Sequence, residues 1–290
     1  MLAGQLIFDG FAMGLVFVIL ACGLVLITSV NRILFMAYGL FYTIGAYTTW
    51  SCIEYLSLPY PVALLIGLVA SGVLGIVCYV LVLHRLQKLE GGFLATLIAS
   101  MGLLMLLNQG SIHLFGTQMR SIPPLFPGIL SLGGITITYS KVFLIGLSIF
   151  TTLLLFLIYE KTSIGRSMRA VSYAPEGAAL QGMNSTRIYL ITMGLGTALA
   201  GFAGGAIAPA YSISPDMGAN VVWTVMLMMM LGGMDSLLGA VVGGVVIGQV
   251  LSFGQYYIGS AVQIVVLVFV GVVLYFKPTG LLGRGIDIGI

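Results

Sequence analysis

The sequence predicts an all-α, polytopic integral membrane protein with a single domain over residues 1–290. Of these residues, 60% are hydrophobic and 7% are charged, against roughly 25% charged in soluble domains. The apolar residues also form repeated runs of about 20 residues, which is the length that a helix needs to cross a bilayer. No soluble domain separates these runs, so we expect the whole chain to form one bundle in the lipid bilayer.

Nine apolar runs follow one another along the chain. They cover residues 11–30, 33–55, 62–83, 93–115, 142–159, 188–210, 220–231, 236–253 and 261–276. The seventh run has only about 12 residues, which is short for a full crossing and is typical of a half-helix packed inside protein. We therefore expect nine membrane segments, some of them broken or half-helices, with eight segments as the alternative.

The basic residues indicate the orientation, because cytoplasmic loops of membrane proteins are enriched in Lys and Arg. Nine crossings from an external N-terminus place nine of them in the cytoplasm: Arg32, Arg85, Lys88, Lys161, Arg166, Arg169, Arg187, Lys277 and Arg284. Only Arg120 and Lys141 then lie outside. With eight crossings, Lys277 and Arg284 move outside and the split falls to seven against four. The larger asymmetry predicts a bacterial-type plasma (inner) membrane protein with its N-terminus outside and its C-terminus cytoplasmic.

The connection between the fourth and fifth runs, residues 116–141, differs in composition from its neighbours. It contains Pro123, Pro124 and Pro127, followed by the alternating sequence ITITY. Proline interrupts regular structure, and alternation of apolar and polar residues is typical of a strand. We expect an external loop with a short pair of strands.

Glycine is unusually frequent, with 40 residues, and several glycines are four residues apart. These pairs are Gly201/Gly205, Gly239/Gly243 and Gly244/Gly248. Small residues at this spacing let helix backbones approach closely in a membrane. We expect such contacts inside the bundle, with an oligomer interface as the less favoured alternative.

A helix break is predicted where the seventh run ends. Gly232 and Gly233 follow that run, and Asp235 precedes the eighth. Asp235 either supplies an ionisable group inside the membrane or caps the N-terminus of the next helix, as Asp often does. A nearby internal similarity, between residues 38–47 and 232–241, has three identities in ten positions. Chance accounts for it in so glycine-rich a chain.

Enzymatic chemistry is not expected on this chain. His84 and His113 are isolated, and the acidic residues are scattered rather than clustered. No lysine follows a glycine, so the Gly-Lys-Ser/Thr motif that binds nucleoside triphosphates is missing. We therefore expect no catalytic residue, metal or cofactor on the chain, and no nucleic acid among its partners.

The loop over residues 161–187 is the longest polar segment between two apolar runs on the predicted cytoplasmic side. Pro175 suits the first turn of a helix, Glu176 complements the positive end of its dipole, and Gly182 ends it. The pattern predicts a short surface helix over residues 175–181. Arg166 and Arg169 share a helix face just before it. The loop either receives a soluble partner or serves as a positively charged anchor.

The same loop resembles a known family. GRSMRAV at residues 165–171, Glu176, and Gly182-Met183-Asn184 are similar to the permeases of branched-chain amino acid ABC importers, specifically the shorter of the two paired permeases. The likeness includes Glu followed six residues later by Gly, although Gly177 replaces the usual Ala. It continues through residues 37–47, 195–205, 231–244 and 277–283.

The resemblance implies a heteromeric importer. Its other parts would be a second permease subunit, two cytoplasmic ATPase subunits that bind ATP and Mg, and an extracytoplasmic solute-binding protein. Arg169, Glu176 and Gly182 would then shape a coupling helix seated in a groove of an ATPase subunit. Import of branched-chain or related amino acids is the function that this likeness implies.

One departure affects the substrate. The family has Asn and His in the second segment where this chain has Phe35 and Tyr38, which makes that part less polar. An aromatic carboxylate or a small amide is therefore an alternative solute for the same architecture.

We predict that the substrate path includes Tyr38, Tyr42, Asn108 and Trp223, which place polar or aromatic groups within apolar runs. Helix packing is the competing interpretation of each. A free-standing secondary transporter or channel, and a membrane scaffold, are the alternative functions. The scarcity of buried carboxylates disfavours ion coupling, and the glycine-broken helices disfavour a passive scaffold.

Overall fold

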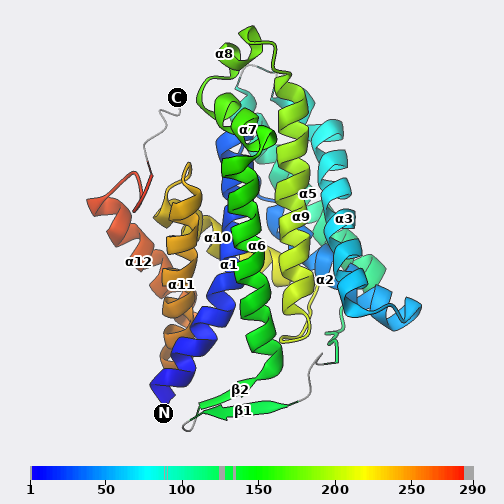
Figure 1. The fold of residues 1–290 in the computed structure, drawn as a ribbon, viewed down its shortest axis with the longest axis vertical. Coiled ribbons are helices and arrows are strands. Elements are labelled where there is room, and N and C mark those ends of the chain that lie inside the picture. Colours follow the sequence, from blue (N-terminus) through cyan, green and yellow to red (C-terminus); the bar gives the residue numbers. More distant parts are fainter. Residues whose placement is uncertain (1, 88, 90, 124–127, 133–134, 284–290) are drawn as a thin grey trace.

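The computed structural model describes residues 2–87, 89, 91–123, 128–132 and 135–283, and it shows an all-α bundle of long helices (Figure 1). The prediction of an all-α fold is confirmed. The apolar helices of the bundle are α1 (Leu2–Asn31), α2 (Tyr38–Leu56), α3 (Tyr60–Cys78), α5 (Gly92–Phe115), α6 (Tyr139–Lys161), α9 (Ser185–Ile207), α10 (Met217–Gly232), α11 (Leu237–Ile258) and α12 (Val262–Phe276). A π-helical turn, η1 (Tyr79–Leu83), joins α3 to α4 (His84–Leu86), and a 3₁₀ turn, η2 (Gly259–Ala261), precedes α12.

Six helices in the described part of the chain are long and apolar enough to cross a membrane: α1, α3 with its extension to Leu86, α5, α6, α9 and α11. The apolar helices α10 and α12 are shorter, with 16 and 15 residues. The chain is thus a multi-pass membrane protein. The count of nine crossings stays a prediction, which depends on α2, α10 and α12.

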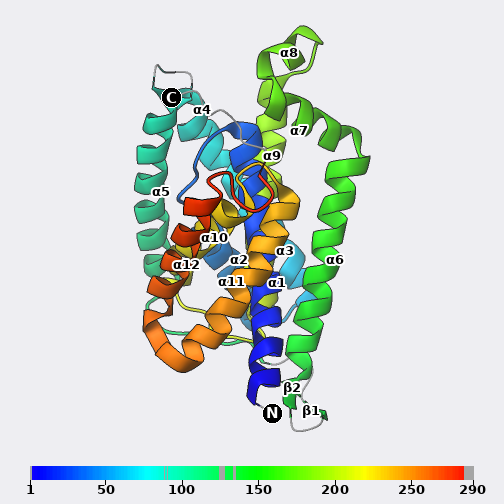
Figure 2. The ribbon, with the colours of Figure 1, turned by 90° about the vertical axis from the view of Figure 1, so that its left-hand side faces the viewer.

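The two ends of the bundle differ in structure. The start of α1 lies beside a hairpin of β1 (Ile129–Leu132) and β2 (Ile135–Thr138), whereas α7 (Ser163–Tyr173) and α8 (Pro175–Leu180) lie at the opposite end (Figures 1 and 2). The strands are antiparallel, with Leu130 opposite Ile137. The predicted strand pair is therefore confirmed.

The predicted external basic residues lie at the hairpin end. Lys141 forms an ion pair with Asp9, with 2.6 Å between Nζ and Oδ1, and Arg120 exchanges backbone hydrogen bonds with Ile213. The predicted cytoplasmic residue Arg169 lies at the α7 end. Four residues named above lie outside the described part of the chain: Lys88, Pro124, Pro127 and Arg284.

Two helices occupy the centre of the bundle. In its most apolar stretch, α1 is 83% buried and α9 is 78% buried, against 11% for α5 and 22% for α6. α1 packs along α11, α9 packs along α3, and α2 and α10 contact each other. α2 also packs along α9 and α3, so the central helices form one continuous set of contacts. The weak similarity of residues 38–47 to 232–241 relates the start of α2 to the end of α10 and the start of α11.

Glycines permit the close contacts between these helices. A Cβ atom on Gly45 of α2 would lie 2.1 Å from the carbonyl oxygen of Gly201 in α9. Where α2 and α10 begin, Gly39 and Gly218 approach each other in the same way, with 2.1 Å from a Cβ on Gly39 to the Gly218 oxygen. Helix backbones cannot approach so closely with larger residues. These glycines serve packing inside the bundle, as we expected.

The helix break lies at the predicted glycines, but its cap differs from the prediction. α10 ends at Gly232, and Gly233 follows with φ of 109°. α11 begins at Leu237, and Ser236 is its cap, because its Oγ accepts a hydrogen bond from the Gly239 amide at 3.0 Å. The prediction that Asp235 caps this helix is wrong, since Asp235 lies one residue too early.

The segment after α12 packs across this break. The Leu281 amide donates to the Leu231 carbonyl at 2.8 Å, and the Leu282 amide donates to the Gly232 carbonyl at 3.0 Å. These bonds satisfy carbonyls that the end of α10 would otherwise leave without partners. The sequence KPTGLLG, which the family likeness includes, thus has a structural role at the break.

Candidate coupling surface and transport path

The candidate coupling loop, residues 161–187, begins at a sharp turn between α6 and α7. Thr162 caps α7, because its Oγ1 accepts a hydrogen bond from the Gly165 amide at 3.1 Å. A Cβ atom on Gly165 would lie 2.1 Å from the Tyr159 carbonyl oxygen. Only glycine fits this contact, so the turn fixes the direction in which α7 leaves the bundle.

Arg169 joins α7 to the end of α6. Its guanidinium donates hydrogen bonds to the carbonyls of Tyr159 and Glu160, lies 3.4 Å from the Glu160 carboxylate, and stacks 5.2 Å from the centre of the Tyr159 ring. A cation at the C-terminus of a helix is favourable because it complements the helix dipole. Arg169 therefore positions the loop from within and does not project freely toward a partner.

The helix predicted over residues 175–181 is present as α8, which covers Pro175–Leu180. Pro175 occupies its first turn, and Glu176 lies in the same turn. Gly182 follows with φ of 80°, a left-handed conformation that favours glycine. The amide of Met183 donates to the Ala178 carbonyl at 3.1 Å and completes the C-terminal cap.

The loop has one anchored face and one exposed face. Met168, Val171 and Ala178 are buried in a small cluster with Val30 of α1. On the other side, the Leu180 side chain is 91% exposed and Tyr173 is 69% exposed. The loop therefore presents two apolar side chains on its exposed face.

Three contacts tie the loop to the central helix α1. Arg32 donates from Nη2 to the carbonyls of Ser172 and Tyr173, at 3.1 and 3.4 Å. The Ser172 hydroxyl donates to the Ser29 carbonyl at 2.8 Å. From the sequence, Arg32 was interpreted only as a cytoplasmic charge. The one sequence signal for its contacts with α7 is its position directly after the first apolar run. A displacement of α7 would therefore act directly on α1.

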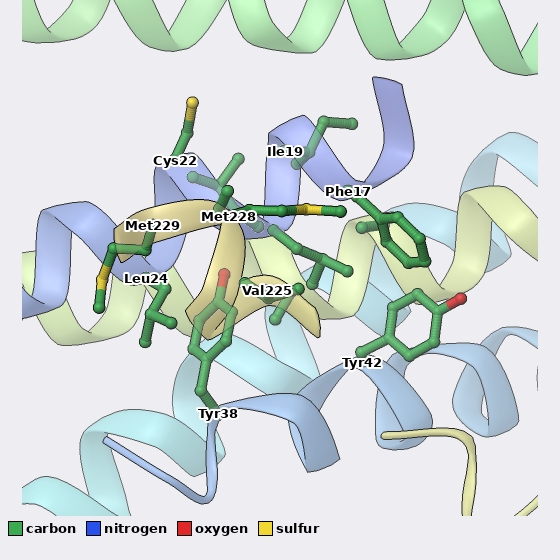
Figure 3. Close-up of a cluster of buried hydrophobic side chains, with 14 of the residues drawn as sticks. Phe17, Ile19, Cys22, Leu24, Tyr38, Tyr42, Val225, Met228 and Met229 are labelled. Atoms are coloured by element: carbon green, nitrogen blue, oxygen red, sulfur yellow. The ribbon is translucent and has the colours of Figure 1, made fainter. Parts of the chain in front are cut away.

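Two of the predicted path residues lie in the core (Figure 3). Tyr38 is fully buried, and its hydroxyl donates to the Gly196 carbonyl of α9 at 3.3 Å. Tyr42 is 3% exposed. Both extend from α2 into a cluster with Met228 of α10 and Phe17 of α1. In this conformation they pack helices together, and their role in a path stays a prediction.

The other two predicted path residues lie elsewhere. Asn108 of α5 donates from Nδ2 to the Asp216 carboxylate at 3.2 Å, just before α10 begins. Trp223 of α10 is 58% exposed. The structure therefore does not bring the four residues to one place.

That outward side of α10 consists of Asn220, Trp223 and Met230, all of which are exposed. We call it the open face of α10. The rest of the helix packs against α1, α2, α11 and α12. The side chains of Trp223 and Met230 are therefore uncovered apolar groups on a helix that otherwise packs inside the bundle.

The described residues contain no group of three His, Cys, Asp or Glu side chains that would hold a metal ion. The cysteines Cys22, Cys52 and Cys78 are buried, free and on three different helices.

Comparisons with known proteins agree with this arrangement. Residues 6–277 match the family described as branched-chain amino acid transport system / permease component. The chain is 27% identical over 293 residues to the high-affinity branched-chain amino acid transport system permease protein BraD of Pseudomonas aeruginosa, covering 97% of this chain and 95% of that protein. It is 26% identical over 298 residues to the corresponding permease protein LivH of Escherichia coli K12, with the same coverage.

A more distant relative and a solved structure extend the comparison. The probable branched-chain amino acid transport permease protein LivH of Methanocaldococcus jannaschii is 26% identical over 289 residues, covering 92% of this chain and 88% of that protein. The structure described as PsaBC from Streptococcus pneumoniae in complex with Fab aligns with a TM-score of 0.50 over 95% of this chain and 92% of that chain, at 15% identity. That likeness shows the fold alone.

Proposed function

The chain belongs to the family of branched-chain amino acid transport system permeases, and from this premise we propose that it imports branched-chain amino acids as one permease subunit of a binding-protein-dependent ABC importer. The main support is the family match over residues 6–277, together with relatives similar over nearly the full chain. The chain is a transport subunit and not an enzyme, and ATP hydrolysis belongs to separate subunits. Residues 1–290 form one permease domain in this proposal, with residues 161–187 as its coupling loop.

The partners follow from this architecture. They are a second permease subunit, two cytoplasmic ATPase subunits that bind ATP and Mg, and an extracytoplasmic solute-binding protein. The open face of α10 supports the first of these, because Trp223 is 58% exposed on a helix otherwise packed in the bundle. A second permease that covers this face would bury it.

We place the substrate path along the open face of α10, between the two permeases. Trp223 offers an aromatic surface there. The amide oxygen of Asn108 has no hydrogen-bond partner among the described residues, but it is buried in this conformation. Tyr38 and Tyr42 would reach the path only when α2 and α10 separate, since both are buried now. The choice of solute depends mainly on the binding protein, and an aromatic carboxylate or a small amide is the alternative.

Coupling takes place at α8 in this proposal. Glu176 and the exposed Leu180 would contact a groove of an ATPase subunit, while Gly182 and Arg169 hold the helix in place. The contacts of Arg32 with the end of α7 would pass the movement to α1. The ATPases would thereby open and close the path without a nucleotide site on this chain.

Charge reversal at Glu176 tests the coupling role. In proteoliposomes with the ATPases and the binding protein, Glu176→Lys is expected to lower ATP-driven leucine uptake at least about tenfold, because a charge pair lost at a buried interface costs about 2–5 kcal/mol. ATP hydrolysis should no longer respond to the solute-loaded binding protein. Glu54→Lys, the same charge reversal at another exposed glutamate near the end of α2, is the matched control and should keep this response.

Two results would contradict the proposal. Uptake at the wild-type rate in Glu176→Lys would remove the coupling role of α8. Solute transport by the purified chain alone, without any ATPase subunit, would favour the free-standing transporter instead.

The orientation is also a proposal, with the N-terminus outside and the C-terminus cytoplasmic. It is supported by the position of α7, which carries Arg166 and Arg169, at the end opposite to the start of α1 (Figure 1). A reporter that is active only in the cytoplasm should be active when fused after Ile290. An inactive reporter, with the fusion protein present in the membrane, would contradict nine crossings.

A further inference from the structure

The loop after α5 is joined to the segment before α10 at an isolated β-bridge. Arg120 and Ile213 face each other in antiparallel orientation, and each donates a backbone hydrogen bond to the other, at 2.9 and 2.7 Å. Asn108 of α5 adds a third link, because its Nδ2 donates to the Asp216 carboxylate at 3.2 Å. These contacts fasten the hairpin end of α5 to the start of α10, and we call them the α5–α10 latch.

The side chain of Arg120 extends the latch to α2. Its guanidinium carbon lies 4.8 Å from the centre of the Trp50 ring, and a cation over an aromatic face is attracted to it. Arg120 forms no ion pair within the described part of the chain, and residues 124–127, which follow it in the sequence, include no acidic side chain. Arg120 thus links the loop after α5 both to α2 and to the segment before α10.

The closed latch leaves polar atoms buried without partners. Among the described residues, seven buried side-chain atoms lack a hydrogen-bond partner, and three of them lie here: Nε of Arg120, Oδ1 of Asn108 and the hydroxyl of Tyr47. Tyr47 belongs to the same cluster, because its ring meets the Trp50 ring edge-on with centroids 6.5 Å apart, and the charges of Arg120 and Asp216 act on it. A buried polar group without a hydrogen bond is unfavourable. Water that reached these atoms would therefore favour an open latch over the closed one.

The hydrogen bonds of the latch are ones that water can replace. Ser121 and Ser212, which flank the bridge, are exposed, and so is Asp216. A hydrogen bond at such a place contributes little net stability, because water takes over both partners when it breaks. Little apolar packing opposes the separation either, since α5 stands at the edge of the bundle and is only 11% buried in its most apolar stretch (Figure 2). The contacts between α5 and the start of α10 are thus weak enough to be reversible.

We propose that the α5–α10 latch is a gate on the outer side of the substrate path, and that it opens in each transport cycle. Opening separates the loop after α5 from the start of α10 and gives the solute access to Oδ1 of Asn108, which is buried while the latch is closed. Arg120 is a positioning residue of this gate, since it holds the loop against Trp50. The inference rests on the proposed function, which places the path along the open face of α10.

A permanent structural tie is the competing interpretation, and locking the latch separates the two. Ser121 lies opposite Ser212, directly beside the bridge. Opposite residues of antiparallel strands have Cβ atoms about 4.5–5.5 Å apart, close to the separation that a disulfide spans. The double variant Ser121→Cys/Ser212→Cys therefore allows the latch to be locked by oxidation and released by a reductant. The native cysteines are buried and do not compete.

Import should follow the state of this disulfide. In proteoliposomes with the ATPases and the binding protein, ATP-driven leucine uptake by the oxidised double variant should be at least about tenfold slower than by the reduced one, because a locked gate stops the cycle. The single variants Ser121→Cys and Ser212→Cys are the matched controls and should import equally with and without oxidant. Uptake by the fully oxidised double variant at the reduced rate would overturn the gate.

A distance measurement detects the opening without a transport assay. Thr117 of the loop and Ser212 before α10 are both exposed, so Thr117→Cys/Ser212→Cys can carry a spin label on each side of the latch. The complete transporter alone should give one distance between the labels. During turnover with ATP and solute-loaded binding protein, a second and longer distance should appear. One unchanged distance under turnover would show a permanent tie and overturn the gate.

The outcomes for the gate and for the proposed function can be told apart. Normal leucine uptake by the wild type, together with unimpaired uptake by the oxidised double variant, would overturn the gate and leave the import function intact. Absence of leucine uptake by the wild type with its binding protein and ATP would instead contradict the import function, and with it the gate.

Discussion

The centre of the bundle and the coupling loop are held together in different ways. In the centre, backbone touches backbone, as where Gly45 of α2 meets Gly201 of α9. In the loop, side chains bind backbone carbonyls at helix ends, as Arg169 does at the end of α6 and Arg32 at the end of α7. The centre therefore resists any added atom, whereas the loop keeps its outer face free.

Because of this difference, we expect the central helices to determine the stability of the chain and the exposed face of the loop to determine its function. A membrane bundle gains little from burying apolar side chains away from lipid, so close packing supplies much of its stability. An exposed apolar residue such as Leu180 buries little surface in the isolated chain, and in the proposed function an ATPase subunit covers it. We therefore expect substitutions in the centre to change folding, and substitutions on the outer face of the loop to change assembly and transport.

The largest effect is expected at Gly45. In Gly45→Ala, the new Cβ atom would lie 2.1 Å from the carbonyl oxygen of Gly201 and 2.3 Å from its Cα. Backbone atoms cannot rotate away, so α2 and α9 must separate. Overpacking of this kind costs about 1–3 kcal/mol or more, and we expect a Tm in detergent lower by several degrees, with less protein in the membrane.

Gly146→Ala is the matched control for this substitution. A Cβ atom on Gly146 of α6 has nothing within 4 Å, and alanine favours the helix. Its Tm should be equal to that of the wild type or higher. An unchanged Tm in Gly45→Ala would mean that the centre of the bundle can relax, and the contrast with the loop would be lost.

The secondary structure of the loop could be predicted from local sequence signals, whereas the arrangement of the central helices could not. Pro175, Glu176 and Gly182 act within one turn of chain, and the helix they predict is the one found. The alternating ITITY stretch likewise became a strand. Such signals depend on the backbone preferences of a few adjacent residues, so one sequence is enough to read them.

The arrangement of the centre could not be predicted in the same way. Lipid and protein interior are both apolar, so hydrophobicity does not tell which side of a membrane helix faces the core. For this reason Tyr38 and Trp223 were predicted to lie in one path, although one is fully buried and the other is 58% exposed. Arg32 was missed because its role depends on α7, which lies far along the chain. At Asp235 the error was local, since the adjacent Ser236 has the geometry of the cap.

A smaller effect is expected at Leu180, which tests the exposed face of the loop rather than the central helices. Its side chain is 91% exposed, so Leu180→Ser should leave the Tm of the isolated chain unchanged. Full burial of a leucine contributes about 1.5–3 kcal/mol. If an ATPase subunit covers it in part, the affinity of the permease for that subunit should fall about threefold to tenfold in a binding titration.

Leu180→Met keeps the apolar surface and should restore affinity, because the contact depends on apolar area rather than on shape. A lower Tm in Leu180→Ser, with unchanged affinity for the ATPase, would show that this residue stabilises the chain itself and would remove the distinction between the two regions.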